Sequence, residues 1–179
     1  MAYTCNLTGG FPIICAPNTG GTYEVYIGSW NGTAQTYVLG TSSNIDQIIS
    51  FGGTTASFYT FNSEAQTAEF KQEGAFNPQN HTTFYNQSIA ITLQKMTTDT
   101  AKLVNTLGVG RWRAIVKDSN ANYWYLGEVD GLKVSAMSGG SGKAKGDLNG
   151  FSITLSGAEQ DVAKQVTTAA ALTLITAAS

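Results

Sequence analysis

A period of two in the apolar and polar residues runs along most of this chain and predicts a protein built mainly of β-strands. The longest such run covers residues 83–93, where Tyr85, Ile89 and Ile91 alternate with small, mostly polar residues. A strand with this period is expected to bury one face and expose the other. Alternation or a short β-branched run predicts further strands at residues 23–30, 36–39, 45–51, 58–61, 67–73, 112–117, 123–129, 132–136 and 150–155.

Turn residues between these runs predict how the strands connect. Asn-Gly at 31–32 is expected to fold residues 23–30 and 36–39 into a hairpin, because both residue types tolerate positive φ. The polar run 118–122 is expected to join its two flanking strands into a second hairpin. Residues 74–81 are expected to form a polar loop.

The period changes to about 3.6 residues further along the chain. Met96, Leu103, Val104 and Leu107 recur at helical spacing, with threonines before the run and glycines after it. These signals predict one helix at residues 98–107, capped by a threonine and stopped by the glycines. The helix is expected to pack on a sheet through Leu103, Val104 and Leu107.

The chain is expected to fold as a single domain over residues 1–179, because no change in composition marks a boundary. Strands of this number and spacing, with one helix, indicate a β-sandwich or barrel. In the Ala- and Thr-rich tail, residues 158–166 favour a helix and residues 172–175 favour a strand, so the structure of the tail is left open. The expected parts are an N-terminal arm at 1–22, a β core at 23–157 with the helix near 98–107, and a C-terminal tail at 158–179.

Charge is scarce in this sequence. Charged residues make up 12% of the chain, about half the usual share for a soluble domain. Ten Lys and Arg stand against twelve Asp and Glu, so no strongly basic surface is available to grip nucleic acid. So little surface charge favours a chain that lies inside an assembly. No apolar run reaches the roughly 18 residues of a membrane span and no secretory leader is recognisable, so we expect neither a membrane span nor secretion.

Groups for catalysis or metal binding are few. His81 is the single histidine, far in sequence from Cys5 and Cys15, which we expect to be reduced thiols, with a disulfide as the second interpretation. Gly-Gly-Ser-Gly-Lys at 139–143 lacks the Ser or Thr that follows the lysine of a phosphate-binding loop, because Ala144 stands there. We therefore expect no catalytic residue, no metal site, no cofactor and no enzymatic activity.

Residues 82–156, under half of the chain, carry a recognisable order of elements. An extended strand at 83–93 precedes Met-Thr-Thr-Asp at 96–99, then Asp-Ser-Asn-Ala-Asn-Tyr-Trp at 118–124, Leu-Gly-Glu at 126–128 and Gly-Asp-Leu-Asn-Gly-Phe-Ser-Ile-Thr-Leu at 146–155. This order resembles virion structural proteins, tail-tube or tail-ring components, of tailed bacteriophages of Bacteroidetes, including crAss-like phages. The resemblance lies in strands and turns and includes no catalytic signature.

This resemblance implies a β-sandwich or barrel of the phage tail-tube type with one flanking α-helix. It implies a non-enzymatic tail-tube or tail/connector ring subunit that homo-oligomerises around a DNA channel. The implied partners are other copies of the chain, neighbouring tail or connector proteins of the virion, and DNA that passes without sequence-specific binding. The implied location is the virion, at the tail or head–tail joint, after synthesis in the cytoplasm of a bacterial host.

The polar faces of the strands at 67–73 and 83–93 are the expected channel wall, and the Gly-rich tip at 138–149 is an expected contact between subunits. Two carboxylates on the first strand favour an acidic wall, which repels DNA phosphates, but Lys71 shares their face and weakens the field, so the sign is left open. The residues expected to line the channel are Glu69, Lys71, Glu73, Asn86, Ser88 and Thr92. Those expected in the inter-subunit loop are Gly139, Gly140, Ser141, Gly142 and Lys143.

Aromatic and basic residues on adjacent predicted strands support an alternative function. Arg-Trp-Arg at 111–113 and Tyr-Trp-Tyr at 123–125 offer rings and charges of the kind that stack on sugars or bases. The alternative is a virion surface or head-decoration β-sandwich that binds glycan or a host surface through Trp30, Trp112 and Trp124. A role of these rings in the core or in a subunit interface is favoured over it.

Overall fold

The computed structural model describes residues 18–40, 46–52, 57–61 and 67–176, and the mainly β fold expected from the sequence is confirmed. Most of the expected N-terminal arm, with Cys5 and Cys15, lies outside the described residues. The helices are α1 (Thr98–Val109) and α2 (Thr168–Leu174). The strands are β1 (Thr22–Ser29), β2 (Tyr37–Leu39), β3 (Ile48–Phe51), β4 (Phe58–Phe61), β5 (Ala68–Asn77), β6 (Thr82–Gln94), β7 (Trp112–Asp118), β8 (Tyr123–Leu126), β9 (Lys133–Gly140), β10 (Gly150–Glu159), β11 (Lys164–Val166) and β12 (Ile175–Thr176).

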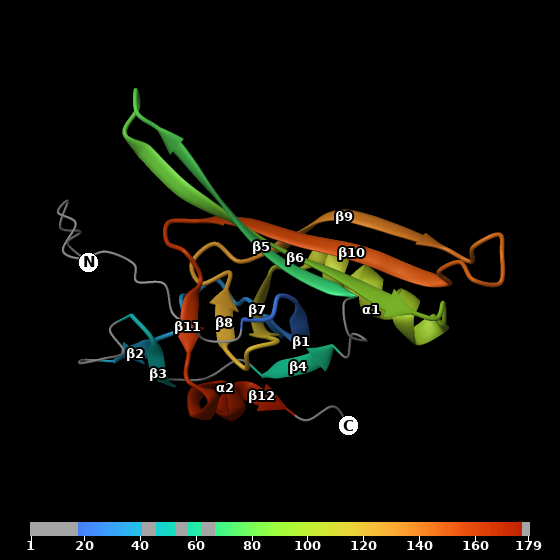
Figure 1. The fold of residues 1–179 in the computed structure, drawn as a ribbon, viewed down its shortest axis with the longest axis horizontal. Coiled ribbons are helices and arrows are strands. Elements are labelled where there is room, and N and C mark those ends of the chain that lie inside the picture. Colours follow the sequence, from blue (N-terminus) through green and yellow to red (C-terminus); the bar gives the residue numbers. More distant parts are fainter. Residues whose placement is uncertain (1–17, 41–45, 53–56, 62–66, 177–179) are drawn as a thin grey trace.

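The strands form two sheets that pack on each other (Figure 1). One sheet has the order β12-β4-β1-β7-β8-β11-β3-β2, and the other has the order β5-β6-β10-β9. The main core contains Val25 and Val116 from the first sheet and Ile91 and Leu155 from the second. Apolar residues at every second position of the long strands build this core, as their alternation predicts.

The eight-stranded sheet also buries its other face. Ile115 of β7 points away from the main core and packs in a second cluster with Ala171 and Leu174 of α2. Both neighbours of Ile115 belong to the main core, so three consecutive residues of β7 are buried. The result is a layered fold in which the larger sheet lies between the smaller sheet and α2 (Figure 1).

β1 lies inside the eight-stranded sheet, so the expected hairpin of β1 with β2 is wrong. β1 pairs with β4 and β7, whereas β2 pairs with β3 at the far edge. Val25, Tyr26 and Ile27 are consecutive and all buried, which suits a strand covered on both faces. Gly32 has a φ of 82° and turns the chain as expected, but the chain then continues to the other side of the sheet.

Residues 158–176 of the C-terminal tail belong to the sandwich, and the helix considered at residues 158–166 is wrong. β10 continues through Glu159 along β6, and β11 then pairs with β8 and β3. Residues 172–175 are mostly helical, because α2 covers the second cluster before β12 joins β4. The apolar run at 172–175 is too short for its period to distinguish a strand from a buried helix.

α1 confirms the predicted helix and two of the three residues that it was expected to bury. The side chain of Thr97 caps the helix by accepting a hydrogen bond from the Thr100 N–H. Val104 and Leu107 pack in the main core, but Leu103, expected beside them, is 37% exposed. The indole N–H of Trp112 donates to the Leu107 carbonyl at 2.8 Å, which satisfies one of the last carbonyls of the helix.

The β5–β6 hairpin is longer than expected, and the loop predicted at residues 74–81 is wrong. β5 runs to Asn77 and pairs with β6 as far as Thr82, so the turn itself covers only residues 78–81. The pairing of β10 with β6 stops at Tyr85. Beyond this point the hairpin is a two-stranded ribbon that projects from the body of the sandwich (Figure 1).

One carboxylate organises the turn between β7 and β8. Asp118 accepts hydrogen bonds from the backbone N–H groups of Asn120 and Asn122 at 2.9 and 2.8 Å. It also accepts one from the Trp124 indole N–H at 3.2 Å. Burial alone would raise the pKa of Asp118, but the hydrogen bonds outweigh burial and hold its pKa below the usual range. The turn also holds the start of the described chain, because the Asn120 side chain accepts from the Thr19 N–H at 3.0 Å.

We expect Asp118→Ala to lower the free energy of unfolding at pH 7 by about 2 kcal/mol, because partly buried donors lose their acceptor. The folded pKa is lowered, so this contribution is present above the unfolded pKa of about 3.9 and is lost as pH falls through the folded value. Asp118→Asn is the matched control, since it keeps the oxygen that faces the two backbone N–H groups. Urea unfolding at pH 7 and pH 3 measures the effect, and an unchanged midpoint for Asp118→Ala at pH 7 contradicts it.

Candidate functional site

The six residues expected to line a channel share one exposed face of the four-stranded sheet, here called the outer face. Glu69, Lys71 and Glu73 of β5 alternate with residues that point toward the core. Lys71 pairs with Ser88 and Glu73 pairs with Asn86 across the β5–β6 ladder, so each pair shares a side of the sheet. Thr92 follows on the same face of β6, between the buried Ile91 and the half-buried Leu93. The structure therefore brings all six together.

β10 and β9 extend this face with residues that the sequence reasoning did not single out. Ser152, Thr154 and Ser156 of β10 pair with Thr92, Ala90 and Ser88 of β6. Ser138 and Lys133 of β9 continue the rows through their pairs with Ser152 and Ser156. The signal was present, because Phe151, Ile153 and Leu155 alternate with hydroxyl residues in the sequence. The outer face is thus four strands wide and carries mainly small side chains, many of them hydroxyls.

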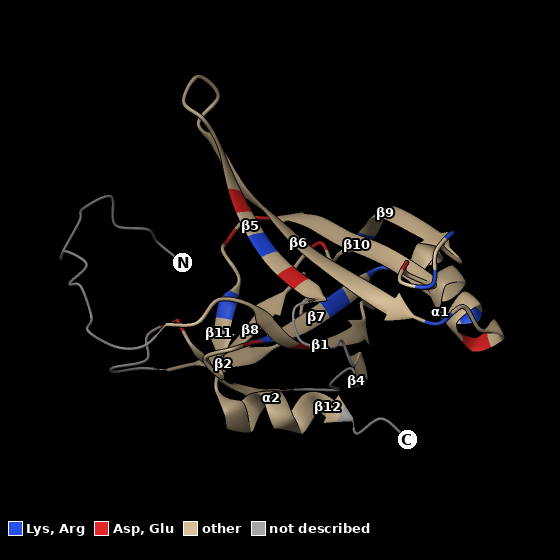
Figure 2. Ribbon diagram, turned by 45° about the vertical axis from the view of Figure 1, so that its right-hand side comes forward, with Lys and Arg blue, Asp and Glu red and all other residues tan. Residues whose placement is uncertain are grey.

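Lys133 changes the electrostatics that the sequence predicted for this face. Along β5 the order is acidic, basic, acidic (Figure 2), and the Lys71 Nζ lies 2.5 Å from the Glu73 Oε1. The hydrogen bond and charge of Lys71 hold the pKa of Glu73 below its usual range, and Glu73 raises that of Lys71. With Glu69 and Lys133 added, two acidic and two basic residues balance. The face is neutral rather than slightly acidic.

A shallow groove of about 450 Å³ runs over the outer face. Lys71, Glu73 and Ser88 line it on one side, and Thr154 and Ser156 line it on the other. Within the ranges that the structure describes, no three His, Cys, Asp or Glu residues lie close enough to hold a metal ion. The groove offers hydroxyls and one exposed ion pair, which contributes little interaction energy.

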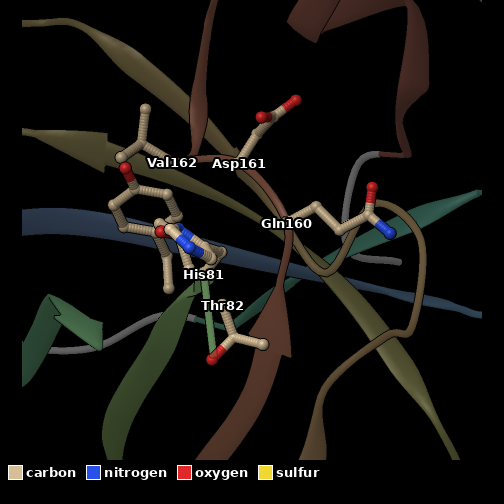
Figure 3. A pocket seen from close by; sticks show the side chains of 7 residues that line it. His81, Thr82, Gln160, Asp161 and Val162 are labelled. Carbon is tan, nitrogen blue, oxygen red and sulfur yellow. The ribbon is translucent and has the colours of Figure 1, made fainter. Parts of the chain in front are cut away.

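A second cleft, of about 670 Å³, lies between the projecting hairpin and the chain that follows β10, and we call it the hairpin cleft (Figure 3). Its apolar part includes Tyr85 and Val162. Near it, the Lys164 Nζ lies 2.6 Å from the Glu128 Oε2 and 3.5 Å from the Asp161 Oδ2. Two carboxylates on one ammonium leave this group with a charge of −1. The residues lining the hairpin cleft are His81, Thr82, Thr83, Tyr85, Gln160, Asp161 and Val162.

Glu159, next to this cleft in sequence, is a buried carboxylate with three backbone donors. It is 3% exposed and accepts hydrogen bonds from the N–H groups of Val129, Asp130 and Gly131 at 3.1, 3.1 and 3.2 Å. Burial raises its pKa, and the three hydrogen bonds only partly offset that effect. Gln87 lies beside these groups and forms two hydrogen bonds. Its side chain accepts from the Gly127 N–H and donates to the Asp161 carbonyl. These groups tie the two sheets together.

The expected inter-subunit loop divides between a strand and a connection. Gly139 and Gly140 belong to β9 and pair with Phe151 and Gly150, so the tip expected to begin at residue 138 is shorter than predicted. A Cβ on Gly139 would meet the Phe151 ring at 2.4 Å, which explains a glycine there. Ser141, Gly142 and Lys143 lie in the exposed connection 141–149, here called the lysine loop.

The lysine loop has its own internal order. The Asp147 carboxylate accepts hydrogen bonds from the N–H groups of Lys143 and Ala144, both at 2.8 Å. These bonds hold the pKa of Asp147 below its usual range. The Lys95 N–H donates to the Asn149 carbonyl at 2.7 Å and fixes the base of the loop to the end of β6. The aspartate thus gives this Gly-rich loop a hydrogen-bonded turn.

The three tryptophans considered for glycan binding do not form a common platform. Trp112 and Trp124 pack against the main core, and Trp124 lies beside Phe70 with ring centroids 6.5 Å apart. The guanidinium of Arg111 covers the Trp30 ring at 5.1 Å. All three indole N–H groups donate to acceptors within the chain. Trp112 and Trp124 thus take part in the packing of the main core.

Comparison with known proteins finds no matching family, no matching curated protein and no matching solved structure. Across the part of the chain that the structure describes, neither helix has the length and apolarity needed to cross a membrane.

Proposed function

We propose that this chain is a non-enzymatic virion structural protein, a tail-tube or tail/connector ring subunit that homo-oligomerises around a DNA channel. The outer face of the four-stranded sheet forms the channel wall. The partners are further copies of the chain, neighbouring tail or connector proteins of the virion, and DNA that passes without sequence-specific binding. The proposal places the protein in a virion, at the tail or head–tail joint.

The observation that carries this proposal is a sheet with one buried face, one small polar face and two open edges. Among the described strands, β5 and β9 each have a partner on one side only. Open edges are templates for pairing with another chain, and closure of a sheet into a barrel removes them. If β9 of one copy lies beside β5 of the next, the sheets of all subunits join around one axis, with their outer faces toward the lumen.

The chemistry of the outer face suits a conduit for DNA. A wall that neutralised many phosphates would hold the duplex through counterion release. Here Glu69 and Glu73 balance Lys71 and Lys133, and the remaining positions are mostly Ser, Thr or Ala. Such a wall is hydrated and has no net attraction for phosphate.

Purified protein is expected to form closed rings at micromolar concentration. Size-exclusion chromatography with light scattering gives the mass, and negative-stain microscopy shows whether a central hole is present. A monomer under all salt conditions would contradict the proposal.

Glu69→Lys with Glu73→Lys is expected to make intact rings retain double-stranded DNA, with an affinity gain on the order of tenfold or more at low salt. Each subunit gains four units of positive charge at the wall, so the gain should fall steeply as salt is added. Asp99→Lys with Asp130→Lys is the matched control, because it changes the net charge equally and lies off the outer face. Equal DNA binding by the two double variants, or none by either, would show that Glu69 and Glu73 do not line the lumen.

A further inference from the structure

The two ends of the four-stranded sheet differ in shape. The β5–β6 hairpin projects at one end, and the lysine loop lies at the other end (Figures 1 and 2). The strands run along the line that joins these ends. A contact between the ends of two copies would therefore lie along the strand direction, and it would leave the edges formed by β5 and β9 free.

The hairpin end carries apolar surface that nothing in the described chain covers. Phe76 is 65% exposed and contacts Tyr85 edge-to-face, with ring centroids 6.0 Å apart. Both continue the row of β5 and β6 residues that is buried further along the sheet. Val162, across the hairpin cleft, is 53% exposed. A two-stranded ribbon is at best marginally stable alone, and exposed apolar surface of this kind marks an interaction site.

The lysine loop offers the complement. Leu148 is 47% exposed, and the neighbouring Met96 is exposed as well. Lys143 and Lys145 outnumber Asp147 in the loop, whereas Glu128, Lys164 and Asp161 beside the hairpin cleft sum to −1. The two ends thus combine apolar residues with opposite net charges. Asp147 pre-forms the turn, which lowers the entropy lost when the loop binds.

We infer that the hairpin cleft of one copy receives the lysine loop of a second copy, with Leu148 against Tyr85 and Val162 and the lysines toward the carboxylates. The cleft, about 670 Å³, has the size of a typical binding pocket. Because the two surfaces lie at opposite ends of the molecule, the contact is heterologous and repeats along the strand direction. This inference rests on the proposed function and extends it: edge pairing closes a ring, and the loop-in-cleft contact stacks one ring on the next into a tube.

The test separates ring formation from stacking. Wild-type protein is expected to give rings and stacks of rings by negative-stain microscopy and sedimentation velocity. Lys143→Ser with Lys145→Ser should give single rings. The protein concentration needed to form stacks should rise at least tenfold. Lys102→Glu lowers the net charge by the same two units at an exposed position of α1 and should stack normally. Wild-type rings that never stack, or loop variants that stack as wild type does, overturn the inference and leave the proposed function standing. A wild-type monomer overturns both.

A charge exchange identifies the partner surface. Lys143→Glu with Lys145→Glu, and separately Thr83→Lys with Val162→Lys, should each block stacking, and all four positions are exposed so the subunit should fold. Mixing the two double variants should restore stacks of alternating rings, in which an altered loop meets an altered cleft of opposite charge at one contact and an unaltered loop meets an unaltered cleft at the next. Circular dichroism confirms folding of each variant. Loss of stacking in both variants without recovery in the mixture shows that the loop and the cleft bind other surfaces, and overturns the inference.

Discussion

Leu107→Asp is expected to lower the free energy of unfolding by about 4 kcal/mol or more, whereas Leu103→Asp on the same helix should cost less than about 1 kcal/mol. Leu107 is 2% exposed and packs in the main core beside Val104. An aspartate there would bury a charge without a partner. Leu103 lies one helical turn earlier and remains accessible to water, so an aspartate at that position keeps its hydration.

Thermal and urea unfolding of the two variants, measured side by side, test this contrast. Helix propensity is the same for both changes, so the difference reports mainly burial, with a smaller contribution from the helix dipole because Leu107 lies in the last turn of α1. Equal destabilisation by the two variants would show that α1 buries a different side from the one described.

Glu159→Ala is the second change with a large expected effect, a loss of about 3 kcal/mol in the free energy of unfolding at pH 5. Three backbone N–H groups, those of Val129, Asp130 and Gly131, lose one shared acceptor, and each partly buried donor left unsatisfied costs about 1 kcal/mol or more. Glu159→Gln is the matched control, since its amide oxygen can still accept from the turn. It should lose less than half as much.

The pH dependence of Glu159 has a definite sign. Burial raises its folded pKa above the unfolded value of about 4.3. The folded state then binds the proton more tightly, so the contribution from this shift is complete below the unfolded pKa and is lost as pH rises through the folded pKa. Wild type should become less stable over that interval by more than Glu159→Gln does. Parallel stability profiles for the two proteins between pH 4 and pH 7 would contradict a raised pKa.

The alternation in the sequence was sufficient to locate most strands and to assign their faces. Glu69, Lys71 and Glu73 are exposed and Ile89 and Ile91 are buried, as a period of two requires. Alternation does not say which strands are neighbours. The Asn-Gly turn after β1 therefore suggested a local hairpin, although the sheet instead pairs Val25 with Phe61 and Val116. β1 pairs with β4 and β7 because this central position buries both of its faces, and alternation along the sequence does not reveal that position.

In the candidate site, too, the sequence predicts which face a residue lies on but not all of its neighbours. The six predicted outer-face residues lie together, yet Lys133 was not foreseen, because a register shift between Thr154 and Leu155 separates it from the simple alternation of β9. That lysine cancels the acidic charge that β5 alone suggests. Leu103 was misplaced because it lies at the margin of the buried stripe of α1. The buried or half-buried positions are Thr100, Ala101, Val104 and Leu107, and Leu103 lies just outside them, next to Leu107.

The central position of β1 has a consequence for how the protein is made. β1 (Thr22–Ser29) takes one of its two neighbours, β7, from about ninety residues further along the chain. At a synthesis rate of 5 to 20 residues per second, the interval between these two strands is about 5 to 18 s. During that time an apolar strand has both its faces and one edge uncovered on the ribosome. The high contact order of this pairing makes folding slow. Aggregation therefore competes with folding in the nascent chain rather than in the finished subunit, and that is the stage at which a chaperone would act.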